Sequence, residues 1–246
     1  MTTFPADLHV HTALSPCAAD EMTPPAIVDR ALREGLAMIA ICDHNSARNA
    51  AAVQRAAGAR LVVLAGMEIT SVEECHVVGL FPDARAAEAA GARVATLLPE
   101  AEEGYAQFFG EQSVLDARGE LLDRETRALA TATPLDLAAC VELVHRHGGL
   151  AIAAHVDRPS FGVIGQLGVF PEEAGLDAVE VSRHVPPGTP DEQTYAAIGL
   201  SLLRSSDAHF LADIGAARTS LDVAYASFSA VAAALRAGAS RRGTHA

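Results

Sequence analysis

The sequence contains no lysine, so all 18 of its basic side chains are arginines. This absence excludes a Schiff-base lysine and a carbamylated lysine bridging two metal ions. Tryptophan is also absent and aromatic residues make up only 4% of the chain, so a core must consist mainly of Ala, Val, Leu and Ile. No apolar run is long enough to span a membrane, and no basic segment followed by an apolar one opens the chain. We therefore expect neither a membrane association nor a signal peptide.

Cysteine and positive charge are also scarce. The four cysteines, Cys17, Cys42, Cys75 and Cys140, form no CxxC pair. Their scatter is typical of free thiols in a reducing compartment, and we expect a cytoplasmic protein. The net charge of −13 argues against broad electrostatic binding of nucleic acid, which requires a basic surface. We therefore expect a small phosphorylated substrate and no large nucleic acid as partner.

Half of the residues are apolar, and 246 residues suit one large α/β domain. Short apolar segments alternate with amphipathic ones, which predicts a barrel or an open parallel sheet. The predicted strands cover residues 4–10, 36–42, 60–65, 74–80, 150–154, 178–181 and 201–205. Residues 84–132 are less regular and are predicted to form an inserted cap that includes a hairpin turning near Arg118 and Gly119. A helix at 224–237 and a disordered tail from about 238 complete the prediction.

Two histidines, His9 and His11, lie one residue apart at the end of the first predicted strand, where strand alternation places them on one face. An HxH pair alone is weak evidence for a metal site, but nearly every later strand also ends in a possible ligand. The full set is His9, His11, His44, Glu68, His76, His155, Asp207 and His209. Barrels and open α/β sheets gather the ends of their strands at one site, so these residues should meet. Imidazole and carboxylate together suit Zn, Mn or Fe.

Six segments now carry a resemblance to a known family. They read DLHVHT, ICDHN, GMEIT, CHVVGLF, AHVDRPS and SSDAH, and they are spread from Asp7 to His209. Together they resemble the PHP (polymerase and histidinol phosphatase) superfamily. The resemblance implies an α/β fold, a distorted (β/α)7 barrel with a cluster of metal ions, and the hydrolysis of phosphoesters.

The resemblance also distributes the ligands among two or three divalent ions (Mn, Zn or Fe). It implies a first ion held by His9, His11, Glu68 and Asp207, a second held by His44 and His209, and a third held by Glu68, His76 and His155. The family usually has a ninth ligand, His or Asp, shortly after the HxH pair. Cys17 stands at a spacing that some members use for His, and Asp20 lies farther on, so we assign Cys17 and keep Asp20 as the alternative.

Two aspartates adjoin these residues. Asp43 is expected to orient His44 or its loop, because ligands are commonly held by a further hydrogen bond. Asp157 is expected either to pin its own loop or to pair with Arg158.

Three side chains near the strand ends could act on a phosphate. Arg158 follows His155 by three residues, and its guanidinium can bind two phosphate oxygens at once, although a surface salt bridge is the alternative. Arg183 and His184 follow another strand, where substrate binding and plain surface are both open. We assign Arg158, Arg183 and His184 to substrate binding, and Asp207, Arg158 and His184 to catalysis. The proton donor to the leaving group is a metal-bound water, His184 or Asp207.

These observations predict a metal-dependent phosphoesterase that hydrolyses a small sugar, nucleotide or amino-alcohol phosphate with metal-activated hydroxide. One alternative is a nuclease-type phosphodiesterase acting on short oligonucleotides. Another is a regulator that binds metal without turnover. A barrel amidohydrolase or deaminase is the third, but many of these need the carbamylated lysine that this chain lacks.

Overall fold

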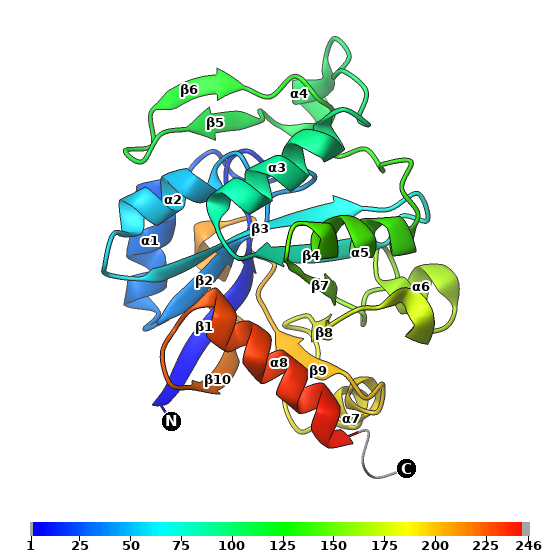
Figure 1. Ribbon diagram of the computed structural model, residues 1–246. Helices are drawn as coiled ribbons and strands as arrows, with labels where there is room; N and C mark the ends of the chain where they lie inside the picture. Colours follow the sequence, from blue (N-terminus) through cyan, green and yellow to red (C-terminus); the bar gives the residue numbers. More distant parts are fainter. Residues whose placement is uncertain (1, 243–246) are drawn as a thin grey trace.

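The computed structural model describes residues 2–242, which form a strongly curved sheet with helices around it (Figure 1). The sheet has eight strands in the order β10-β1-β2-β3-β4-β7-β8-β9. Their bounds are β1 Thr2–Val10, β2 Met38–Ile41, β3 Val62–Thr70, β4 His76–Phe81, β7 Leu150–Ala153, β8 Ala178–Val181, β9 Ser201–Arg204 and β10 Thr219–Val223. The sheet is nearly closed, so the predicted α/β barrel is confirmed, with eight strands where seven were expected.

The sheet is mixed rather than wholly parallel. β1, β2 and β3 are parallel, as are β7, β8 and β9, but β4 runs antiparallel to both of its neighbours and β10 runs antiparallel to β1. The reversal of β4 arises because only a short loop joins it to β3, whereas a parallel connection needs a long crossover. As a consequence His76 begins its strand instead of ending it. Its pairing with Thr70 nevertheless places it at the same end of the barrel as the other predicted ligands.

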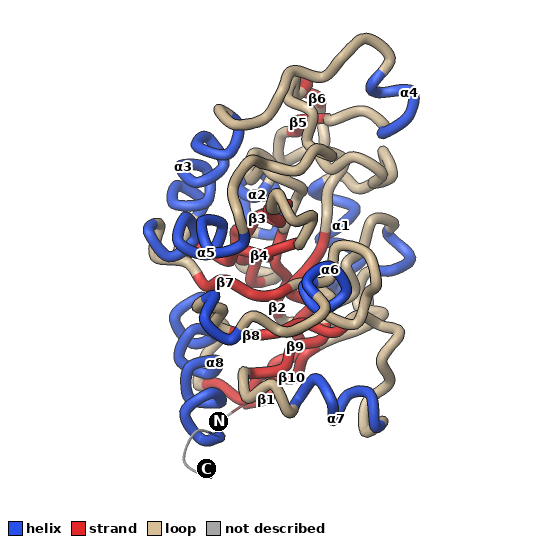
Figure 2. Tube along the Cα trace, turned by 90° about the vertical axis from the view of Figure 1, so that its right-hand side faces the viewer, coloured by secondary structure: helices blue, strands red, loops and turns tan. Residues whose placement is uncertain are grey.

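Eight helices accompany the sheet in the described residues. They are α1 Pro24–Arg33, α2 Ala50–Ala57, α3 Ala84–Ala95, α4 Tyr105–Phe109, α5 Leu137–Arg146, α6 Val163–Leu167, α7 Pro190–Ala196 and α8 Phe228–Arg242. The side view shows α3, α5 and α8 following one another along one side of the strands (Figure 2). α3 packs on β3 and β4, α5 on β4 and β7, and α8 on β9 and β10.

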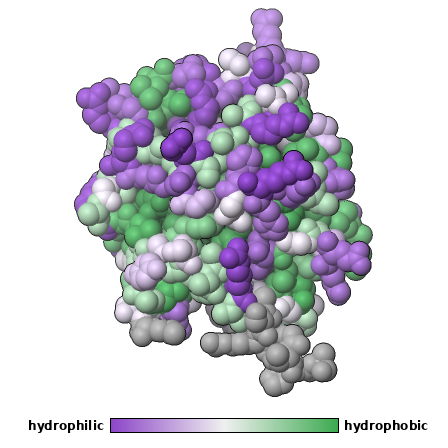
Figure 3. Space-filling model, in the orientation of Figure 1, coloured by the Kyte–Doolittle hydropathy of each residue, from purple (hydrophilic) through white to green (hydrophobic). Residues whose placement is uncertain are grey.

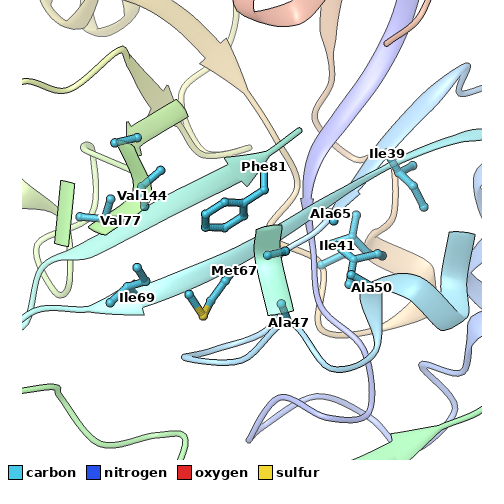
Figure 4. Packing of buried hydrophobic residues seen from close by; sticks show 14 of the residues in the cluster. Ile39, Ile41, Ala47, Ala50, Ala65, Met67, Ile69, Val77, Phe81 and Val144 are labelled. Carbon is cyan, nitrogen blue, oxygen red and sulfur yellow. The ribbon is translucent and has the colours of Figure 1, made fainter. Parts of the chain in front are cut away.

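Two apolar clusters lie on opposite faces of the sheet. The outer cluster joins strand residues such as Ile41 and Met67 to helix residues such as Val144 (Figure 4). The inner cluster draws on all eight strands, together with α8, and fills the space that the sheet encloses. Alternation along β1 predicts Leu8 and Val10 on the same face, but Leu8 lies in the inner cluster and Val10 in the outer one. The pairing of β1 with β2 shifts register between Asp7 and Val10, which redirects the side chains that follow.

Residues 84–132 divide between the barrel layer and a separate hairpin. α3 belongs to the helix layer, whereas β5 (Ser113–Leu115) and β6 (Leu121–Arg124) pair with each other in a sheet of their own. The hairpin turn at Arg118 and Gly119 is as predicted, and Gly119 has the positive φ of 84° that favours glycine. That this segment is an inserted cap stays a prediction.

The chain end differs from the prediction. α8 begins at Phe228 and continues to Arg242, so residues 238–242 are helical where a disordered tail was expected. The rest of that predicted tail, residues 243–246, lies outside the described residues.

Among the described residues no helix is both long and apolar enough to cross a membrane. On the face drawn in Figure 3, hydrophilic and hydrophobic residues are interspersed. All four cysteines are free, Cys17 exposed and the other three buried, as their scatter predicted.

One threonine bridges the place where the sheet does not close. Thr219 of β10 accepts a hydrogen bond from the backbone N of Arg204 in β9 at 2.8 Å and donates one to the Arg204 carbonyl at 2.9 Å. The Thr219 hydroxyl thus makes the two hydrogen bonds to Arg204 that the backbone of a neighbouring strand would make in a closed barrel.

We expect Thr219→Val to lower the free energy of unfolding by about 1–3 kcal/mol, because two backbone groups lose their partner. Urea denaturation followed by circular dichroism measures the change. Thr219→Ser keeps the hydroxyl and is the matched control. Equal losses in the two variants would show that the methyl group, and not the bridge, contributes the stability.

Candidate metal centre

The predicted ligands converge at one end of the barrel around the carboxylate of Glu68 in β3. Three groups of side chains place their nitrogen and oxygen atoms within 4.8 Å of one another, as a metal ion requires. They are His9, His11, Glu68 and Asp207; His11, His44 and His209; and His44, Glu68 and His76. Because His11, His44 and Glu68 each belong to two groups, the three form one continuous cluster.

The inner oxygen of Glu68 fits a metal ion better than it fits a hydrogen-bond network. Glu68 Oε2 is buried and has no hydrogen-bond partner, although three imidazole nitrogens surround it. These are His9 Nε2 at 3.4 Å, His11 Nε2 at 3.5 Å and His44 Nδ1 at 3.0 Å. The Nε2 atoms of His9 and His11 also lie only 3.1 Å apart. Several nitrogens aimed at one unsatisfied oxygen are the arrangement expected of ligands that share metal ions.

The other oxygen of Glu68 faces the two remaining histidines. Glu68 Oε1 lies 2.8 Å from His76 Nδ1 and 3.2 Å from His155 Nε2, and these two nitrogens lie 3.3 Å apart. The triangle matches the third ion implied by the resemblance, with Glu68 reaching both parts of the cluster. The ligand assignments remain proposals.

The charges of the cluster balance one another. Burial alone would raise the pKa of Glu68, but His76, His9 and His44 hold it well below its ordinary value. Burial acts the same way on Asp207, where His9 is the strongest opposing charge and the pKa is again held well below its ordinary value. Both carboxylates are therefore anionic, as metal ligands must be.

Glu180 is a member of the centre that the sequence prediction missed. It is buried in β8, and its Oε1 lies 3.0 Å from His9 Nδ1 and accepts a hydrogen bond from the backbone N of His155 at 3.3 Å. A carboxylate on one ring nitrogen of a histidine fixes the direction of the other, here toward the cluster. The available signal was a single acidic residue within the apolar strand Ala178–Val181.

Asp43 organises the loops that carry His11 and His44. It accepts hydrogen bonds from the backbone N of Thr12 at 2.7 Å, from the Thr12 hydroxyl at 2.9 Å and from the Ser15 hydroxyl at 2.7 Å. The same Ser15 oxygen lies 2.8 Å from His11 Nδ1 and accepts a bond from the backbone N of His44 at 3.0 Å. Asp43 therefore acts on His44 through its loop, one of the two roles predicted for it.

Asp7 has the corresponding role on the last ligand loop. It accepts hydrogen bonds from the backbone N and hydroxyl of Ser206, at 2.9 and 2.6 Å, and from the backbone N of Gly215 at 2.8 Å. Burial raises the pKa of Asp7 to about 6 even though these bonds lower it. The contacts fix the segment on which Asp207 and His209 stand.

Two asparagines fasten the hairpin region to the rim of the centre. The amide of Asn45 donates to the Leu129 carbonyl at 2.9 Å. The amide of Asn49 donates to the Thr12 hydroxyl at 2.9 Å and to the Ser113 carbonyl at 3.0 Å. The sequence prediction assigned neither residue, because a polar residue after a strand gives no sign of its distant partner.

Arg158 reaches the cluster, as predicted. Its guanidinium lies 2.6 Å from Asp207 Oδ2, and its side chain remains 34% exposed. Asp157 settles the predicted alternative by pinning its loop, since it accepts bonds from the backbone N and hydroxyl of Ser182 at 2.7 and 2.6 Å. The loop between β7 and α6 thus presents Arg158 beside an anionic ligand and open to solvent.

The structure does not bring every predicted side chain into the cluster. Cys17 and Asp20 are exposed, and neither belongs to any of the three ligand groups. Arg183 pairs with Asp213. His184 is exposed, and its backbone N donates a hydrogen bond to the Ser182 hydroxyl at 3.2 Å. The roles predicted for these residues stay predictions.

Comparison with known proteins agrees with this geometry. The sequence matches the PHP domain family over residues 7–170 and the PHP-associated family over residues 193–240. A search of curated proteins found no match.

Solved structures share the fold at low sequence identity. The lesion-specific endonuclease Q from Pyrococcus furiosus is 15% identical, with a TM-score of 0.72 over 96% of this chain and 56% of that chain. A candidate metal-dependent phosphoesterase from Bifidobacterium adolescentis is 22% identical, with a TM-score of 0.58 over 83% of this chain and 87% of that chain. The chain thus spans little more than half the length of endonuclease Q.

One comparison corrects the expectation about partners. Endonuclease Q has also been solved with a 27-mer duplex carrying an abasic lesion at its active site, at 15% identity and a TM-score of 0.69 over 96% of this chain and 57% of that chain. A protein of this fold therefore takes duplex DNA as a substrate, and excluding a large nucleic acid from the net charge was wrong.

The PHP domain match covers well over half of the chain and includes six of the eight candidate ligands. The other two, Asp207 and His209, lie beyond it on the segment that Asp7 fixes. The family match supports a hydrolase that acts on phosphoric esters. By its sequence match and its ligand-lined barrel, the chain belongs to the PHP family of metal-dependent phosphoesterases.

Proposed function

We propose that this protein hydrolyses a small phosphate ester, such as a sugar, nucleotide or amino-alcohol phosphate. The observation that supports this proposal is the cluster around Glu68. Its Oε2 is buried among imidazole nitrogens without a hydrogen-bond partner, and the partly exposed guanidinium of Arg158 lies beside the cluster. A metal cluster next to a partly exposed guanidinium suits a phosphoryl group, which carries negative charge on several oxygens.

The ligand set divides by the groups described above, with His155 added through its contact with Glu68 Oε1. Two or three divalent ions fit, because eight candidate ligands exceed what one ion can hold, and the donor types suit Mn, Zn or Fe. When bound, such ions supply a water of lowered pKa and neutralise charge on the phosphoryl oxygens.

The side chains of the rim would orient the substrate and return a proton to the leaving group. Arg158 would exchange its contact with Asp207 for two phosphoryl oxygens and so orient the ester. Glu180 and Asp43 keep the histidines aimed at the centre, which limits reorganisation when the substrate binds. His184 and Asp207 are our candidates for returning a proton to the leaving alcohol, and Arg183 would assist only after leaving Asp213.

A nucleic acid is the second candidate substrate, and the observation that favours it is the complex of endonuclease Q with duplex DNA. Assays with a chromogenic phosphate monoester, a short oligonucleotide and a duplex containing an abasic site discriminate between these possibilities. If the protein binds metal but hydrolyses none of these three substrates, the result would favour a non-catalytic regulator.

We expect exhaustive chelation to abolish ester hydrolysis, and Mn or Zn to restore it, since bound metal ions lower the pKa of water and so supply hydroxide at neutral pH. Elemental analysis of protein never exposed to chelator should give two or three transition-metal ions per chain. A value of one or less contradicts the multinuclear assignment.

The ninth ligand can be tested by a pair of substitutions. If Cys17 binds metal, Cys17→Ser lowers the metal content and Asp20→Ala leaves it unchanged, because a thiolate is the stronger ligand for Zn or Fe. The reverse result assigns the position to Asp20. Unchanged metal content in both variants rejects both residues.

We expect Arg158→Ala to lower kcat/KM by about two to three orders of magnitude, because its contact with phosphoryl oxygens strengthens as charge develops in the transition state. Metal content should stay near that of the wild type. Arg158→Lys is the matched control and should recover only part of the loss, since an ammonium lacks the planar fork. Wild-type activity in Arg158→Ala would show that this residue has no part in substrate binding. Loss of metal in the same variant would show instead that Arg158 stabilises the position of His155.

A further inference from the structure

A single rim loop carries three side chains that face the centre. The loop follows β7 and carries His155, Arg158 and Phe161. The ring of Phe161 stacks on the ring of His76 with centroids 4.6 Å apart and an interplanar angle of 22°. His155 and Arg158 already have proposed roles in ligation and phosphate binding. Phe161 has none, although its ring contacts His76 of the cluster.

The backbone holds Phe161 in an unfavourable conformation. Its φ is +62°, which is rare for a bulky residue and costs about 1–3 kcal/mol. The Phe161 carbonyl accepts a hydrogen bond from the backbone N of His76 at 2.9 Å, so the loop is fastened to the start of β4. Gly162 follows where a Cβ would lie only 2.4 Å from the Arg158 carbonyl oxygen, which shows how tightly the loop folds back. The fold thus maintains a strained position that aims a phenyl ring at the centre.

The ring is nonetheless not buried. Phe161 remains 41% exposed, and His76 is the ring stacked on it in the described part of the chain. Since His76 covers one face, the open surface belongs to the other face and the edge. A side chain needed only to shield His76 gains nothing from presenting an apolar face to water.

We propose that Phe161 is a stacking platform for a planar aromatic or heteroaromatic ring in the substrate. The inference rests on the proposed function and narrows it to phosphate esters whose alcohol carries such a ring, as a nucleoside or a benzylic alcohol does. Arg158, three residues earlier on the same loop, holds the phosphoryl group while Phe161 receives the ring. Stacking on an aromatic side chain is strong enough to select substrates and tolerates different rings.

Two pairs of substrates test the platform, one with the ring close to the phosphate and one with the ring farther from it. Benzyl phosphate and cyclohexylmethyl phosphate have leaving alcohols of similar acidity but differ in planarity, and adenosine 5′-monophosphate and ribose 5-phosphate differ by the base. In Phe161→Leu, KM for at least one ring-bearing ester should rise about tenfold, while its ring-free partner changes less than twofold. Phe161→Tyr should restore the preference, and metal content should not change in either variant.

Tyr225→Leu is the matched control. Tyr225 is 61% exposed and follows β10, whose pairing with the start of β1 places it at the end of the barrel opposite the centre. The substitution should leave both preferences unchanged. Equal losses for both members of each pair in Phe161→Leu, or no loss, would overturn the platform and leave Phe161 as a support for His76.

Binding separates failure of the platform from failure of the proposed function. If the metal-loaded wild type hydrolyses none of these esters, titration calorimetry with benzylphosphonate and cyclohexylmethylphosphonate replaces the kinetics. A selective loss of benzylphosphonate affinity in Phe161→Leu keeps the platform and rejects the small-ester activity. Equal affinity for the two phosphonates in the wild type rejects the platform as well.

Discussion

The buried carboxylate of Glu68 is the constraint on which the rest of the centre depends. Burying a carboxylate away from water costs several kcal/mol of folding free energy unless opposite charges and hydrogen bonds compensate it. Histidines from β1, β4 and the loops after β2 and β7 surround it, yet Oε2 makes no hydrogen bond to them. The surrounding protein therefore holds Oε2 among the imidazoles without a hydrogen bond, and a metal ion would supply the compensation that this oxygen lacks.

That holding structure is a ring of further carboxylates and hydroxyls. Asp43 ties the loops after β1 and β2, Asp7 ties β1 to the segment after β9, and Glu180 fixes His9 from β8. Each makes two or more hydrogen bonds, so each buried charge is satisfied locally. The ligands keep their close arrangement because the strands beneath them are packed through two apolar clusters.

The sequence indicated which candidate ligands lie close together but did not indicate the residues that support them, and the reason is physical. A histidine at a strand end is visible because the barrel architecture itself brings such ends together, so His44 and Asp207 could be placed without knowing any contact. Glu180 lies inside a strand, and its partner depends on which face the pleat presents, which in turn follows the register. The direction of β4 was missed for a similar reason: an apolar run indicates a strand but not its orientation, and only the short loop after Thr70 hinted at an antiparallel return.

The error about nucleic acid shows the limit of net charge as an argument. A total of −13 describes the whole surface, whereas a phosphate meets the field of the few groups near it. At this centre the nearby charges are an exposed guanidinium and sites for divalent cations, and the acidic residues around them are already neutralised by histidine or hydrogen bonds. Part of the negative charge also lies in surface ion pairs such as Arg48 with Asp123, where an arginine already compensates it. A strongly acidic chain can therefore have a locally positive potential at the open end of its barrel. Which phosphate ester binds there then depends on the shape and chemistry of the rim, where Arg158 and Phe161 lie on one loop.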